Sequence, residues 1–133
     1  MKVILSHQFS SSTDIEVISA EVPSFCEEYK FALLQTYVYH EIVESKGFPI
    51  QRKVFIFEIC QARVASLILT SYPQFSVFMP CKIVLYEELD QTVITTMDLT
   101  PMLQVIGQDE PIFQEANTLY EQLKSLLLKL AGI

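Results

Sequence analysis

The feature that most constrains the fold is a pair of β-forming runs separated by a short polar turn. The runs are Phe75–Glu88, "FSVFMPCKIVLYEE", and Gln91–Leu99, "QTVITTMDL", and between them the chain reads "ELDQ". Two such runs joined by a tight turn are typical of an antiparallel hairpin. The sequence therefore predicts two neighbouring strands here, with Asp90 and Gln91 at the tip of the turn.

Three further segments predict strands: "KVILSHQF" at 2–9, "LLQTYVYH" at 33–40 and "KVFIFEIC" at 53–60. In the last of them apolar and other residues alternate, so Phe55, Phe57 and Ile59 share one face. Aromatic and branched side chains are commonly buried in a core. We therefore expect this face of the sheet to be covered.

Helices are predicted between the strands. Residues 10–32 are expected to be mostly helical, with Ser12, Thr13 or Asp14 as the cap and Pro23 as a break or a second start. A short helix at 40–48 should close at Gly47, where a left-handed residue is favoured. A third helix should span 62–73.

Two more helices follow the hairpin. Asp98 or Thr100 should cap the first, which has Pro101 in its first turn. The second, at 110–132, is long and amphipathic, with one apolar stripe made of Ile112, Ala116, Leu119, Leu123, Leu126 and Leu130. The predicted fold class is α+β: a single domain over 1–133, with a largely antiparallel or mixed sheet of about five strands, helices on one face and a long C-terminal helix.

Composition and charge limit the partners. The formal net charge is −7, and no basic cluster is larger than Arg52-Lys53, so the chain lacks the basic footprint that nucleic acids and anionic membranes require. Half of the residues are hydrophobic, which predicts an apolar surface patch and with it a homodimer. No signal peptide or 18-residue apolar run is visible, and the cysteine count is odd, so we expect a cytoplasmic protein with reduced thiols.

Two cysteines are the main candidates for chemistry. Cys60 ends a predicted strand just before a helix, where backbone N–H groups and the helix dipole would lower the pKa of a thiol. Cys81 opens the next strand, which returns to the same edge of the sheet. The pair could form a redox couple, a thiolate nucleophile or part of a metal site. Alternatively, each could be a small buried hydrophobe, which is the more frequent role of cysteine.

The remaining polar candidates are weaker. Glu58 is either exposed on an open sheet face or, if covered, needs a partner. His40 precedes Glu41, but adjacent residues on a helix do not face each other, so a capping or exposed histidine is expected. His7 is weaker still, and Cys26 is expected to be structural. No phosphate-binding loop, catalytic elbow or zinc signature is present in the sequence.

The segments "FEICQARVASLIL" and "SYPQFSVFMPCKIVLYEELDQTVITTMDLTPML" resemble the bacterial family called domain of unknown function 302, best over residues 33–130. Its pattern has an E-I-C-N-P segment, a P-C segment and a strand ending in Y-E. These match Glu58–Cys60, Pro80-Cys81 and Tyr86-Glu87, whereas Gln61-Ala62 departs from the family's Asn-Pro. The resemblance implies a compact α+β domain that tends to form homodimers and has no established activity.

Two functional readings follow from the sequence. The first is a non-catalytic dimeric module that binds a small apolar ligand or a partner protein. The second is a thiol-dependent redox protein, or a metal- or haem-binding protein, that uses Cys60 and Cys81, with Glu58 and His40 as nearby polar groups. The first is favoured because buried structural cysteines are common. The sequence names no cofactor.

Overall fold

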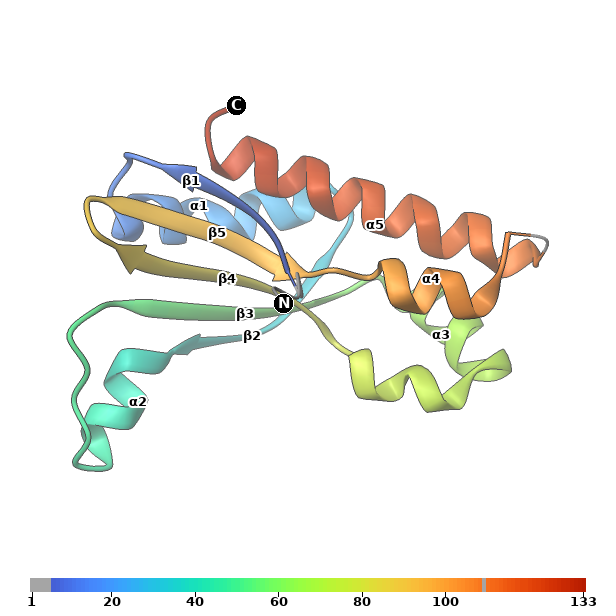
Figure 1. Cartoon of the computed structure of the whole chain (residues 1–133), viewed down its shortest axis with the longest axis horizontal. Helices are drawn as coiled ribbons and strands as arrows, with labels where there is room; N and C mark the ends of the chain where they lie inside the picture. The colour runs from blue at the N-terminus through green and yellow to red at the C-terminus, as the bar shows by residue number, and fades with distance from the viewer. Residues whose placement is uncertain (1–5, 109) are drawn as a thin grey trace, which may run out of the picture.

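The computed structural model describes residues 6–108 and 110–133, and its centre is a five-stranded sheet with the strand order β1-β5-β4-β3-β2 (Figure 1). Neighbouring strands all run antiparallel. The predicted α+β class is confirmed, and the sheet is antiparallel rather than mixed. The strands are β1 (Ser6–Ser11), β2 (Ala32–Val38), β3 (Val54–Cys60), β4 (Cys81–Glu88) and β5 (Gln91–Met97).

The helices occupy three places around this sheet (Figure 1). Helices α1 and α5 pack on one face, α3, η1 and α4 gather beyond one end, and α2 projects at the opposite end. Their bounds are α1 (Ile15–Glu28), α2 (Tyr39–Ser45), α3 (Ala62–Ser71), the 3₁₀ helix η1 (Pro73–Phe78), α4 (Thr100–Ile106) and α5 (Pro111–Leu130). Of the first predicted strand, residues 2–5 lie outside the described part of the chain.

The central hairpin is present, with two corrections. Strand β4 begins at Cys81 rather than Phe75, because the residues before Pro80 form η1. Phe75 is buried there, with its ring 5.2 Å from the ring of Tyr72. The turn lies one residue earlier than predicted, since Glu88 pairs with Gln91. Its tip is therefore Leu89 and Asp90, and Leu89 adopts a positive φ of 54°.

Helix α1 is continuous through Pro23, contrary to the predicted break. Its N-cap is Asp14, one of the three predicted, whose Oδ1 accepts a hydrogen bond of 2.7 Å from the Glu16 N–H. Pro23 lies on the exposed side, where water can satisfy the carbonyl that loses its partner. The opposite side is a buried stripe, which holds both halves of the helix on the sheet: Ile15, Ile18, Val22 and Cys26.

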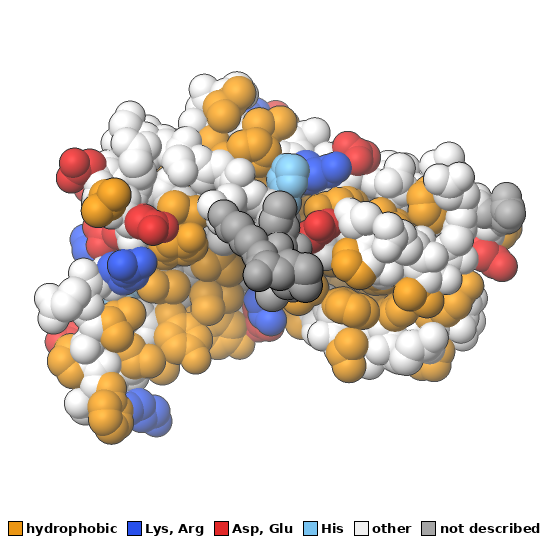
Figure 2. Space-filling view, viewed as in Figure 1, with side chains coloured by type: hydrophobic (Ala, Val, Ile, Leu, Met, Phe, Trp, Pro, Cys, Tyr) orange, Lys and Arg blue, Asp and Glu red, His pale blue; other side chains and the backbone are white. Residues whose placement is uncertain are grey.

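Within residues 6–108 and 110–133, no helix packs across the second face of the sheet. Figure 2 shows hydrophobic side chains gathered over this face beside α2. The residues there are half-buried side chains of three adjacent strands: Tyr37, Val54, Ile56, Val84 and Tyr86. The neighbouring helix α2 contains no buried residue, and it is followed by Gly47 in a left-handed conformation, as predicted.

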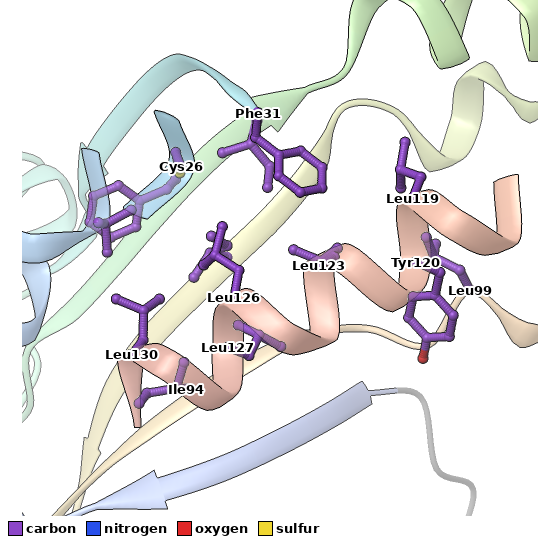
Figure 3. Close-up of a cluster of buried hydrophobic side chains, with 14 of the residues drawn as sticks. Cys26, Phe31, Ile94, Leu99, Leu119, Tyr120, Leu123, Leu126, Leu127 and Leu130 are labelled. Atoms are coloured by element: carbon purple, nitrogen blue, oxygen red, sulfur yellow. The ribbon is translucent and has the colours of Figure 1, made fainter. Parts of the chain in front are cut away.

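The core lies between the other face and α1 and α5 (Figure 3). Helix α5 turns a leucine-rich stripe towards the strands, and Leu123, Leu126 and Leu127 have 0% of their surface exposed. The predicted stripe is confirmed except that Ile112 is only partly buried. The side chains of Phe57 and Ile83 meet it from the sheet, so the alternation at 53–60 correctly predicted the covered face.

The start of α4 is fixed by a carboxylate. Asp98 Oδ1 accepts hydrogen bonds of 2.9 Å from the Thr100 N–H and from the Tyr120 hydroxyl, so it ties the start of α4 to α5. The N-cap position itself is Leu99, so the prediction of Asp98 or Thr100 as the N-cap residue is wrong. Hydrogen bonds from Thr100 hold the pKa of Asp98 below its ordinary value. Burial, followed by the bond to Asp98, raises the pKa of Tyr120 to about 12.

Candidate functional site

The structure brings Cys60 and Cys81 to the same end of the sheet, as predicted. Strands β3 and β4 pair so that Ile59 lies opposite Cys81, and Cys60 is the next residue of β3. Successive residues of a strand point to opposite faces, so this pairing does not aim the two thiols at each other. Both cysteines are free and half-buried, and both line one cavity.

This cavity has a volume of about 340 Å³ and lies where the sheet end meets α3, η1, α4 and α5. Its walls are almost entirely apolar. It is lined by residues from the β3–α3 junction, from α3, from η1 and its link to β4, and from α4 and α5. Representative side chains from each part are Cys60, Ala65, Ile68, Phe78, Met79, Cys81, Met102 and Leu119.

Gln61 joins the cavity wall to α5. It is the N-cap of α3, but its side chain does not cap that helix. Instead, Gln61 Nε2 donates a hydrogen bond of 2.8 Å to Gln122 Oε1 and one of 3.4 Å to the Tyr29 carbonyl. Gln61-Ala62 stands where the family pattern has Asn-Pro. The Gln61 side chain therefore does not cap α3, but it connects the start of α3 to α5.

The surroundings of Cys81 favour its neutral thiol form. Burial is the main cause that raises the pKa of the Cys81 thiol to about 11, and Cys60 adds to the shift. A thiol with this pKa is almost entirely protonated at neutral pH, whereas nucleophilic attack and metal ligation need the thiolate. Cys26 is fully buried in the core, and burial raises its pKa to about 11 as well.

Glu58 and His40 do not join the thiols. The Glu58 carboxylate accepts a hydrogen bond of 2.8 Å from the Tyr37 hydroxyl on the open sheet face, and this bond is the main cause that raises the pKa of Tyr37. His40 Nδ1 accepts a hydrogen bond of 2.9 Å from the Val54 N–H. Val54 and Cys60 stand at opposite ends of β3. The structure therefore places His40 as an anchor of α2 and not as a nearby polar group.

Several cavity residues were not predicted as site residues from the sequence, namely those that α4, α5, η1 and the link between η1 and β4 contribute. Met79 and Met102 are examples, because each looks like an ordinary core residue in the sequence. The signal that could have found them is Pro80-Cys81 beside Cys60, which marks the end of the sheet where these elements converge. Within residues 6–108 and 110–133, no group of three or more His, Cys, Asp or Glu side chains is placed to hold a metal ion.

None of the helices in the described ranges has the length and apolar character needed to cross a bilayer. This finding concerns those helices alone.

Comparisons with known proteins give a family and a fold. The family model described as "Domain of unknown function DUF302" matches residues 7–130. This match starts well before residue 33, so it also includes α1 and all of β1 except Ser6. A solved structure, "Crystal structure of uncharacterized conserved protein DUF302 from Bacillus stearothermophilus", is similar with a TM-score of 0.76 at 19% identity, over 98% of both chains. No curated protein matches the chain.

Proposed function

The chain belongs to the family of the domain of unknown function 302, to which no activity is assigned, and we propose that it is a non-catalytic module that binds a small apolar molecule in the cavity beside Cys60 and Cys81. The observation that carries this proposal is the cavity itself. Its volume of about 340 Å³ lies at the lower end of the range of small-molecule sites. Its walls offer apolar surface to a ligand of matching character.

The polar groups of the cavity support the same conclusion. The Gln61 amide at its edge is already hydrogen-bonded to Gln122. The thiol of Cys81 is neutral at physiological pH, since burial raises its pKa to about 11. A thiol-dependent role for Cys81 would need its thiolate, which this pKa disfavours at neutral pH. The apolar walls and the protonated Cys81 thiol therefore support binding of an apolar molecule.

The test is binding of N-phenyl-1-naphthylamine, a neutral probe whose fluorescence rises in apolar surroundings. The wild-type protein is expected to bind it saturably. Ala65→Phe, which places a ring in the cavity, should weaken binding by about tenfold or more, equivalent to about 1.4 kcal/mol. The matched control is Ala62→Phe, because Ala62 lies on the same helix but is exposed and does not line this cavity.

Circular dichroism and thermal unfolding must show that both variants are folded. The proposal is wrong if the wild-type protein gives no saturable binding, or if the two variants bind the probe equally well. If Ala65→Phe does not fold, Ala65→Leu, with its smaller side chain, takes its place in the same comparison.

We also propose that the protein forms a homodimer through an arm made of α2 and the residues that follow it, residues 39–50. The arm exposes four large hydrophobic side chains, Tyr39, Ile42, Phe48 and Ile50, of which Phe48 is 74% exposed. It adjoins the open sheet face that carries Tyr37 and Tyr86 (Figure 2). Contiguous apolar surface of this kind marks an interaction site, and two-fold dimers are the commonest soluble oligomers.

Phe48→Glu should dissociate this dimer. A carboxylate placed in an apolar interface loses its hydration, and we expect the dimer dissociation constant to rise about 30-fold or more, equivalent to about 2 kcal/mol. The measurement is sedimentation equilibrium over a range of protein concentrations. The control is Val105→Glu on α4, since Val105 is 64% exposed and outside the arm. A wild-type monomer at all concentrations, or a dimer that both variants leave intact, would contradict the proposal.

A further inference from the structure

The cavity collects an unusual share of the sulfur in this chain. The sequence contains three cysteines and four methionines. Cys60, Met79, Cys81 and Met102 all line the cavity, which Phe78 also lines. They come from four places in the fold: the end of β3, the link between η1 and β4, the start of β4, and α4. A ligand held in this cavity would therefore be lined by sulfur-containing side chains from several elements.

Sulfur distinguishes between apolar ligands that are otherwise similar. Thioether and thiol sulfur atoms are polarisable and make favourable contacts with the edges of aromatic rings, whereas a saturated ring offers no equivalent partner. Each such contact favours the aromatic molecule by roughly two- to tenfold in binding. The flexible side chains of Met79 and Met102 can also adjust to a flat ring, because methionine has three rotatable bonds.

The charges around the cavity restrict the ligand further. Among the described residues that line it there is no Asp, Glu, Lys or Arg. A charged group on the ligand would therefore lose its hydration without gaining an ionic partner. Besides Gln61, the polar lining groups are the Ser76 hydroxyl and the thiols of Cys60 and Cys81, and burial raises the pKa of Cys81 to about 11. A neutral ligand is the one that this lining fits.

We infer that the ligand of this cavity is a neutral aromatic molecule, selected over saturated molecules of the same size by the sulfur-containing side chains that line the cavity. This inference rests on the proposed function, that the cavity binds an apolar molecule. It adds the chemical class of the ligand and assigns Met79 and Met102 as the residues that determine the preference. Phe78 adds a ring that can pack against an aromatic ligand.

The experiment compares toluene with methylcyclohexane, which have the same carbon skeleton. The dissociation constant of each compound is measured by its displacement of N-phenyl-1-naphthylamine. Three proteins are compared: the wild type, the double variant Met79→Leu/Met102→Leu and the single variant Met97→Leu. Leucine conserves the volume of methionine, so the double variant should fold. Met97 is the control because it is 46% exposed and does not line this cavity. The readout is the ratio of the dissociation constant of toluene to that of methylcyclohexane in each protein. The two compounds differ in hydrophobicity, but this difference is the same for all three proteins, so it cancels when the ratios are compared.

In the wild-type protein and in Met97→Leu, the ratio should favour toluene to the same degree. In the double variant, the preference should fall by about threefold or more, because two sulfur contacts are lost. If the double variant does not fold, each single variant should show part of this fall.

The possible failures are separable. If the probe binds, but the ratio is equal in all three proteins, the inference about aromatic ligands is wrong and the proposed function stands. If neither the probe nor either compound binds the wild-type protein, the proposed function itself is wrong.

Discussion

Replacing Leu123 with alanine should lower the free energy of unfolding by about 3–5 kcal/mol. Leu123 has 0% of its surface exposed, and it lies in the middle of the stripe that α5 turns towards the sheet (Figure 3). Deleting its isobutyl group removes buried apolar surface and leaves a void that a close-packed core fills only in part. Because a domain of this size is stabilised by about 5–15 kcal/mol, one such change removes a large part of the total.

The measurement is urea-induced unfolding followed by circular dichroism at one fixed protein concentration. The matched control is Leu89→Ala at the tip of the β4–β5 turn, where the same side chain is 98% exposed. That variant should stay within about 0.5 kcal/mol of the wild-type value. Equal losses for the two leucine variants would mean that α5 does not form the core contact described above.

The second large effect is a loss of stability in alkali. Burial raises the pKa of Cys26 from 9.0 to about 11, and the pKa of Cys81 is raised to about 11 mainly by the same cause. The folded protein therefore keeps protons that the unfolded chain releases above pH 9. The stabilisation is fully present below pH 9 and is lost as the pH rises through 11. For the fully buried Cys26 alone, two pH units correspond to about 2–3 kcal/mol.

Unfolding measured in urea at intervals from pH 7 to pH 11 should give a nearly constant free energy up to pH 9 and a steep fall above it. Tyr120, with a pKa of about 12, extends the fall to higher pH. The control is Cys26→Ala, which is less stable at pH 7 but should show a shallower fall between pH 9 and pH 11. If the free energy of unfolding falls equally steeply with pH in the wild type and in Cys26→Ala, the pKa of Cys26 is not raised in the folded protein.

Sequence patterns predicted the elements whose signals are local. The hairpin of β4 and β5 follows from a turn between two β-forming runs, and the buried stripe of α5 follows from its helical period. The covered face of β3 follows from alternation. In each case one chain segment carries the whole pattern, so no knowledge of its neighbours is needed.

The errors arise where tertiary packing overrides a local signal. Pro23 normally ends a helix, but the buried residues on the other side of α1 keep that helix continuous. Phe75–Phe78 has strand composition, yet Phe75 is buried within η1. The cavity has the same origin, because Met102 and Leu119 reach it from helices that follow Cys60 by many residues. The sequence pattern predicted that Cys60 and Cys81 lie at one end of the sheet, but it did not predict which residues of α4 and α5 line the cavity beside them.

The strand order has a consequence for how the chain reaches this structure. Strand β1 pairs with β5, so that Ser6 lies opposite Met97, whereas β4 and β5 are joined by a two-residue turn. Closing a long loop costs more chain entropy than closing a short one, and distant pairings slow folding. The hairpin can thus form early, while β1 docks late. During synthesis, β1 leaves the ribosome before β5 and stays unpaired while the residues between the two strands are made.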